Sequence, residues 1–131
     1  MASIRRDIPI DAAPETVWAA VRDVGAPHKL LTPGVLTDCR MEEGARVVTF
    51  ANGMVVRELI VAVDDAARRF AWSAQGDRFV HHNASLEVVA AEGGKCRLVW
   101  IADLLPDEMA KDVAGLMDLG AAAMQRTLKS R

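Results

Sequence analysis

Two side chains in the middle of the chain are of types that transfer protons or bind polar groups. Glu58 and His82 each lie in an apolar segment whose composition predicts a strand. A carboxylate and an imidazole on neighbouring strands could exchange a proton with a polarised substrate, as a cyclase, dehydratase or isomerase requires. The same pair could instead anchor the polar end of a bound molecule, or His81 and His82 could simply end a strand, bonded to a backbone carbonyl and to water. Asp103 is a weaker third candidate, expected at the rim.

Other chemistries lack their residue patterns in this sequence. The three histidines, His28, His81 and His82, do not have metal-ligand spacing, and there is no Cys-x-x-Cys. No glycine-rich phosphate motif occurs, and Ser73 and Ser85 lack a nucleophile-elbow context. We therefore expect neither a metal nor a cofactor.

Composition limits the partners. The 131 residues are 51% hydrophobic and 26% charged, with a net charge of −2, which is typical of one globular domain. No basic face indicates nucleic acid, and no apolar run has the length of a signal peptide or a membrane span. Two cysteines do not make a disulfide framework. We expect a cytoplasmic protein without stable membrane insertion.

The C-terminal segment, from Pro106 to about Lys129, must position any site. Its apolar residues recur in steps of three and four, which predicts one amphipathic helix. The stripe mixes methionines with small residues: Met109, Val113, Leu116, Met117, Gly120, Ala121, Met124 and Leu128. Small residues leave room and Met is a flexible filler, so this composition is compatible with a helix that forms one wall of an adaptable pocket. An ordinary core stripe is the alternative.

The elements before this helix predict an α+β domain. A strand at Ser3–Ile10 is followed by a helix that opens at Asp11–Pro14 and ends at Gly25, and by a second short helix at Ala26–Leu31. Six hairpin-connected strands follow, with Asn52–Gly53 as the clearest hairpin signal. Residues 1–131 are thus predicted to form a curved antiparallel sheet of about seven strands wrapped around the long helix. The six strands are Val35–Arg40, Ala45–Ala51, Met54–Val63, Arg68–Ala74, Phe79–Ala90 and Lys95–Leu104.

Five short motifs carry a resemblance to a known superfamily. They are Ile10-Asp11-Ala12-Ala13-Pro14-Glu15-Thr16-Val17-Trp18, Pro33-Gly34-Val35, Arg57-Glu58-Leu59, Val63-Asp64-Asp65 and Asn83-Ala84-Ser85-Leu86-Glu87-Val88. In order, spacing and length, the whole chain resembles the helix-grip superfamily, also called START-like or SRPBCC. It includes the START lipid-transfer domains, the birch-pollen allergen relatives, the bacterial polyketide cyclase/dehydrase-like and lipid-transport-like proteins, and the plant abscisic-acid receptors. The gate and latch motifs of those receptors are absent, so hormone perception of that kind is not expected.

The resemblance implies a hydrophobic cavity between the sheet and the C-terminal helix. Alternation leaves the fourth strand ambiguous, with one charge on each face, and the superfamily pattern favours Glu58 pointing inward. The apolar faces of the other strands and the helical stripe supply the expected walls. These ligand-binding residues are Trp72, Ala84, Leu86, Trp100, Leu116, Gly120 and Met124.

Three functions remain open at this point. The leading one is binding or transport of a small hydrophobic or amphipathic ligand, lipid- or polyketide-like, with Glu58 and His82 as polar anchors. The second is a polyketide cyclase- or dehydratase-like enzyme in which Glu58 and His82 transfer the proton. The third is a structural or interaction domain with a filled core, which could form a homodimer.

Overall fold

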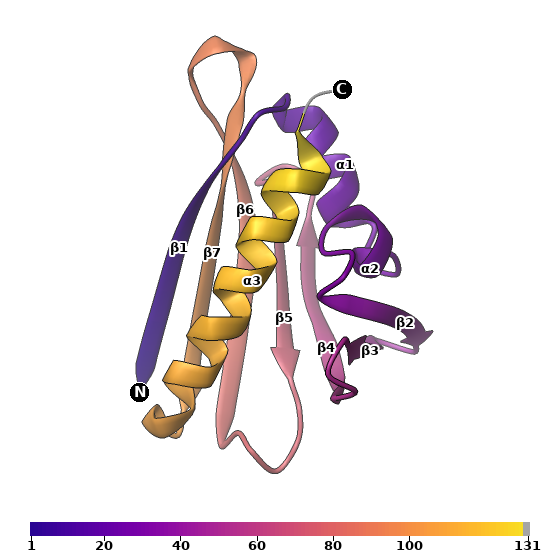
Figure 1. The fold of residues 1–131 in the computed structure, drawn as a ribbon, viewed down its shortest axis with the longest axis vertical. Helices are drawn as coiled ribbons and strands as arrows, with labels where there is room; N and C mark the ends of the chain where they lie inside the picture. Colours follow the sequence, from indigo (N-terminus) through magenta and orange to yellow (C-terminus); the bar gives the residue numbers. More distant parts are fainter. Residues whose placement is uncertain (130–131) are drawn as a thin grey trace.

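The computed structural model describes residues 1–129, in which one long helix, α3, crosses one face of a curved sheet (Figure 1). Two short 3-10 turns, at Glu92–Gly94 and Asp107–Met109, precede β7 and α3. In chain order the elements are β1 (Ala2–Ile10), α1 (Pro14–Arg22), α2 (Pro27–Leu30), β2 (Leu36–Glu42), β3 (Ala45–Phe50), β4 (Val55–Asp64), β5 (Arg69–Ala74), β6 (His81–Ala90), β7 (Cys96–Leu105) and α3 (Ala110–Leu128).

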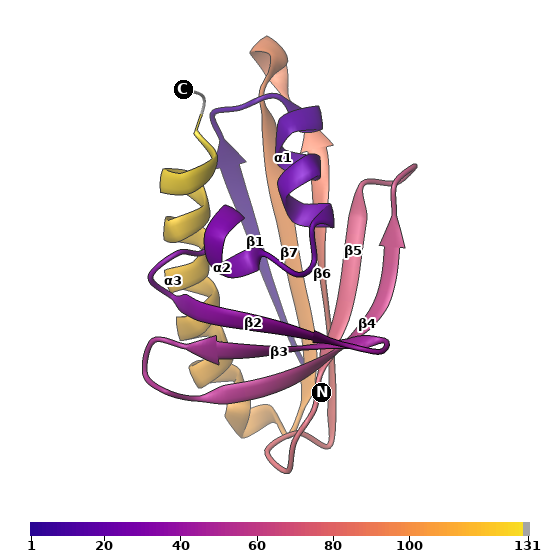
Figure 2. The same cartoon turned by 90° about the vertical axis from the view of Figure 1, so that its right-hand side faces the viewer.

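The sheet is antiparallel throughout, in the order β1-β7-β6-β5-β4-β3-β2. The first strand pairs with the last, and the remaining neighbours are consecutive hairpins. Figure 2 shows β2 and β3 running across the direction of β6 and β7, because the twist accumulates along the sheet. Register shifts in β2, between Leu36 and Asp38, and in β4, between Ile60 and Ala62, add local bends. The helix-grip architecture predicted from the sequence is confirmed.

Most predicted boundaries agree with the structure to within one or two residues, but the long helix begins later than predicted. Pro106 has an extended backbone, with φ −76° and ψ 157°, and a 3-10 turn separates it from α3. The helix therefore starts at Ala110 rather than at Pro106. Proline with an extended ψ ends the preceding strand, so Pro106 belongs to the connection and not to the first turn of α3.

The predicted hairpin at Asn52–Gly53 is present and connects β3 to β4. The Gly53 amide donates to the Phe50 carbonyl, and the side-chain oxygen of Asn52 accepts from the Met54 amide. Gly53 has a φ of 91°, a left-handed conformation that a residue with a Cβ rarely adopts. Three residues, Ala51 to Gly53, form the loop, which is the length that a turn followed by a left-handed glycine produces.

Helix α1 is held against the sheet by its apolar face and by one polar contact. Val17, Trp18 and Val21 are buried, and the Trp18 indole donates to Asp65 in the β4–β5 turn at 2.9 Å. Arg22 binds the same carboxylate at 2.8 Å. Trp18 therefore fastens α1 to the β4–β5 turn.

Part of the hydrophobic core lies at the α1 end of the molecule, away from the cavity. Its fully buried members come from β1, α1 and the start of β7: Ile10, Val17, Val21, Cys96 and Leu98. None of these residues lines the cavity described below. The opposite end, under the first turns of α3, is where the sheet and the helix leave space. No helix within residues 1–129 is long and apolar enough to cross a membrane.

Candidate functional site

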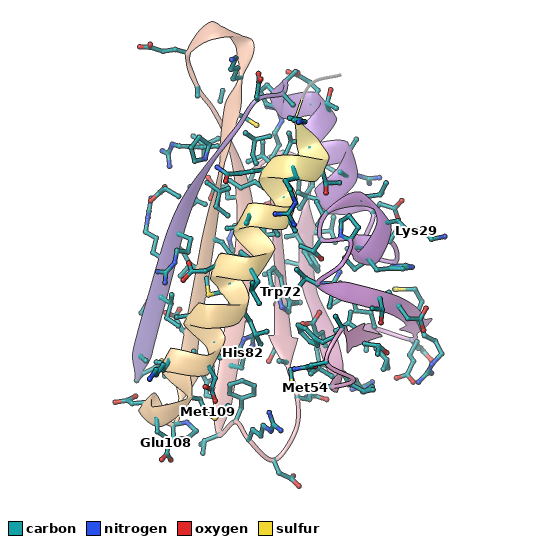
Figure 3. The ribbon with its side chains drawn as sticks, viewed as in Figure 1. Lys29, Met54, Trp72, His82, Glu108 and Met109 are labelled. Carbon is teal, nitrogen blue, oxygen red and sulfur yellow. The ribbon has the colours of Figure 1, made fainter. Side chains whose placement is uncertain are left out.

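A cavity of about 440 Å³ lies between the concave face of the sheet and α3. Most of its lining is apolar. In Figure 3, Trp72 and His82 lie behind the lower half of α3, and Met109 marks the end of the helix nearest to the opening. All of the residues expected to form its walls line it, namely Trp72, Ala84, Leu86, Trp100, Leu116, Gly120 and Met124.

The mouth of the cavity is marked by those lining residues that are exposed to solvent. They belong to the β3–β4 hairpin, the β5–β6 loop and the first turns of α3: Val55, Gln75, Gly76, Asp77, Arg78 and Asp112. Just inside them the Phe79 ring packs on the His82 imidazole, with ring centroids 5.0 Å apart. The cavity thus opens at one end of the molecule and is closed at the other by the packed core.

At one point of the cavity wall a glycine of α3 faces a large aromatic side chain of β7. A Cβ at Gly120 would lie 2.9 Å from two atoms of the Trp100 ring, so a residue with a side chain at this position would force that indole to move. Trp72 follows at a centroid distance of 6.3 Å from Trp100, and Phe70 stacks on Trp72 at 5.0 Å. These three rings, one from β7 and two from β5, form an aromatic strip on the face of the sheet that lines the cavity.

Glu58 points into the cavity and is paired there with an arginine that the sequence analysis did not identify. The Arg46 Nε donates to Glu58 Oε1 at 2.8 Å, and the two side chains are only 7% and 11% exposed. Arg46 and Glu58 are direct cross-strand partners in the β3–β4 ladder. Burial of both charges is tolerated because each neutralises the other.

Arg46 also makes three contacts beyond this pair. Its Nη1 donates to the Val24 carbonyl, in the α1–α2 connection, at 3.0 Å. Its guanidinium lies 5.0 Å from the Phe70 ring centroid and 5.8 Å from that of Trp72, within cation–π range. One guanidinium therefore joins β3, β4, β5 and the α1–α2 connection at the inner wall. The signal in the sequence was the alternation of Arg46, Val48 and Phe50, which places the arginine on the apolar face of β3.

His82 is buried and its tautomer follows from one hydrogen bond. The Ala74 backbone amide donates to His82 Nδ1 at 2.9 Å, so Nδ1 is an acceptor and the proton of the neutral ring is on Nε2. Burial lowers the pKa of His82 below its usual value of 6.5, and the charge of neighbouring His81 lowers it further. The wall therefore presents an uncharged N–H donor at this position.

Glu58 and His82 both line the cavity, but the expectation that they lie on neighbouring strands is wrong. They come from β4 and β6, and β5 lies between them. Ala74 of β5 is the cross-strand partner of Glu58 and also the residue that binds His82 Nδ1, so the two groups flank a single position of β5. Asp103 does not line the cavity, because it alternates with the inward-facing Ala102 and Leu104 of β7.

The polar groups of the cavity wall are suited to hydrogen bonding with a guest molecule. Glu58 Oε2 and His82 Nε2 make no hydrogen bond within residues 1–129, so one acceptor and one donor are free. Over the same residues, no three His, Cys, Asp or Glu side chains come together in a way that could hold a metal ion. The arrangement therefore offers a polar anchor inside an apolar cavity.

We predict that breaking the buried ion pair on one side is far more costly than removing both of its charges. Glu58→Gln leaves Arg46 buried and unpaired, and should lower the free energy of unfolding by about 3–5 kcal/mol. The double change Arg46→Met/Glu58→Leu should cost less than about 1 kcal/mol, because apolar side chains of similar volume replace the pair. Urea unfolding measures both. The control is Glu42→Gln, which removes the carboxylate that pairs with Arg40 and Arg57 at the surface and should cost about 0.2–1 kcal/mol. Equal losses for Glu58→Gln and Glu42→Gln would contradict this account.

The lowered pKa of His82 predicts a pH dependence of stability. An unfolded chain binds a proton at this ring near pH 6.5, whereas the folded chain binds it only at lower pH. The contribution of His82 is therefore complete above pH 6.5 and is lost as the pH falls from there to the lowered folded-state pKa. Imidazole ¹⁵N NMR should show the Nε2–H tautomer at neutral pH, and His82→Gln should remove this part of the pH dependence. An Nδ1–H tautomer, or protonation at pH 7, would be the opposite result.

Comparisons with known proteins agree with this geometry. Residues 1–129 match the model of the family described as polyketide cyclase / dehydrase and lipid transport. Among curated proteins, none matches the chain significantly.

Three similar solved structures indicate the fold. An uncharacterised protein from Bacillus thuringiensis has a TM-score of 0.86 at 18% identity, covering 98% of this chain and 100% of the other. A START superfamily protein from Mycobacterium smegmatis has a TM-score of 0.75 at 15% identity, covering 96% of each chain. Norcoclaurine synthase from Thalictrum flavum, in complex with dopamine and hydroxybenzaldehyde, has a TM-score of 0.72 at 16% identity, covering 95% of this chain and 84% of the other. The chain therefore has the START-like helix-grip fold and belongs to the polyketide cyclase/dehydrase and lipid transport family.

Proposed function

We propose that the chain binds and carries one small hydrophobic or amphipathic molecule, lipid- or polyketide-like, in the cavity between the sheet and α3. The observation that carries the proposal is the cavity itself: about 440 Å³, largely apolar in its lining and open at one end. Cavities of roughly 300–1,000 Å³ with a few convergent polar groups are typical of small-molecule sites. The description of the family, which names lipid transport, supports the same class of ligand.

The filled-core alternative fits the side chains less well. A core that only stabilises the fold would be close-packed, and each large void would cost stability. Here four polar residues, Thr32, Arg46, Glu58 and His82, are buried around the space instead of at the surface. Buried polar groups beside an apolar void are useful to a guest molecule and costly without one.

The enzymatic alternative has weaker support than binding. The family description also names cyclase and dehydrase activity. However, Glu58 Oε1 is engaged by Arg46, and the basic nitrogen of neutral His82 is engaged by the Ala74 amide. A general base needs its lone pair within reach of the substrate proton, and the histidine offers a donor instead. We therefore assign both Glu58 and His82 to anchoring. Of the two side chains, only Glu58 has a free acceptor, its Oε2.

The proposal predicts that the neutral fluorescent probe N-phenyl-1-naphthylamine binds with a stoichiometry of one per chain. Its emission should rise on entry into the apolar cavity. Gly120→Ala should weaken this binding by about fivefold or more, because the added methyl pushes the Trp100 ring toward the cavity and overpacking of this kind costs ~1–3 kcal/mol. A fluorescence titration of both proteins measures the effect.

The matched control is Gly115→Ala in the same helix. A Cβ at position 115 meets nothing within 4 Å, and Gly115 does not line the cavity, so probe affinity should be unchanged. Absence of saturable binding to the unmodified chain would contradict the proposed function. Equal loss in the two variants would contradict the role of the Gly120–Trp100 contact.

A further inference from the structure

The charges around the inner end of the cavity are already balanced. Arg46 is the only buried cation in the lining of residues 1–129, and Glu58 lies 2.8 Å from it. The remaining donors of the guanidinium are partly used as well, since Nη1 binds the Val24 carbonyl. A carboxylate or phosphate entering this end would therefore meet a neutral pair and not a free positive charge.

His82 does not add a positive charge. Its Nδ1 accepts the Ala74 amide, an arrangement that a protonated ring could not make, because both nitrogens of an imidazolium are donors. The ring is buried against Phe79, which further disfavours its charged form. What His82 offers to a guest is one uncharged N–H on Nε2.

The mouth does not select anions either. Its exposed charged residues are one cation, Arg78, and two carboxylates, Asp77 and Asp112. Counted over the whole cavity lining, two guanidinium groups stand against three carboxylates. An anionic ligand would thus be attracted neither at the entrance nor at the inner end.

From these contacts we infer that the cavity selects an uncharged amphipathic ligand, one whose polar end carries a hydroxyl or carbonyl group and not a carboxylate or phosphate. A hydroxyl can donate to Glu58 Oε2, and a hydroxyl or carbonyl oxygen can accept from His82 Nε2. An anion in the same place would be buried without a counter-charge, which is strongly unfavourable. The inference rests on the proposed function, because it specifies the ligand of the same cavity.

The test compares two probes of equal chain length, 1-decanol and decanoate, at pH 7.5. Each competes with N-phenyl-1-naphthylamine for the unmodified protein, and the expected result is that 1-decanol binds at least about tenfold more tightly. Equal affinities, or tighter binding of decanoate, would overturn the inference while the proposed function stands. If N-phenyl-1-naphthylamine does not bind, and calorimetry detects neither 1-decanol nor decanoate, both the inference and the proposed function fail.

A change of preference on mutation gives the sharper result. Glu58→Gln frees the charge of Arg46, so decanoate should gain about tenfold in affinity while 1-decanol gains none. Glu42→Gln removes a surface carboxylate that also pairs with arginine but does not line the cavity, and it should leave both affinities unchanged.

If Glu58→Gln does not fold, Arg46→Met/Glu58→Leu replaces it. That double variant should still reject decanoate and should bind 1-decanol more weakly. The inference is contradicted if Glu58→Gln still rejects decanoate. It is also contradicted if the double variant binds decanoate tightly.

Discussion

The ion pair between Arg46 and Glu58 is the interaction on which the inner wall of the cavity depends. It is a direct cross-strand pair, and the same guanidinium reaches the Val24 carbonyl and lies over Phe70 and Trp72. A buried pair of this kind contributes little net stability compared with apolar side chains, but each partner requires the other. It thereby gives the cavity a polar end without net charge, and it ties the α1–α2 connection to the sheet.

The cavity follows from how the sheet and the helix are built. Twist and two register shifts accompany the curvature of the sheet, whose concave face encloses the space together with α3. Gly120 admits the Trp100 ring, and Met117 and Met124 supply flexible side chains at the same face of α3. These methionines belong to the hydrophobic core and can adjust to an apolar guest, whereas the buried residues between β1, α1 and the start of β7 do not line the space.

Much of the fold could be predicted from the sequence, because periodicity, turn residues and element order all agree. The apolar walls followed from the same periodicity. The ion pair did not, because it depends on register: a two-residue turn at Asn52–Gly53 would pair Arg46 with Leu59, whereas the observed three-residue loop pairs it with Glu58. A shift of one residue exchanges the faces of a strand, and the sequence alone did not distinguish the two loops. The position of His82 relative to Glu58 likewise required the strand order, and its tautomer required the Ala74 contact.

The most direct test of the central claim, that a ligand occupies the space under α3, is an NMR measurement of intermolecular NOEs. The complex of N-phenyl-1-naphthylamine with methyl-labelled protein should show NOEs from the aromatic protons of the probe to the methyl groups of Leu86, Met117 and Met124, all of which line the cavity. NOEs confined to exposed apolar side chains, such as Val61 and Leu119, would place the probe on the surface and would contradict the account.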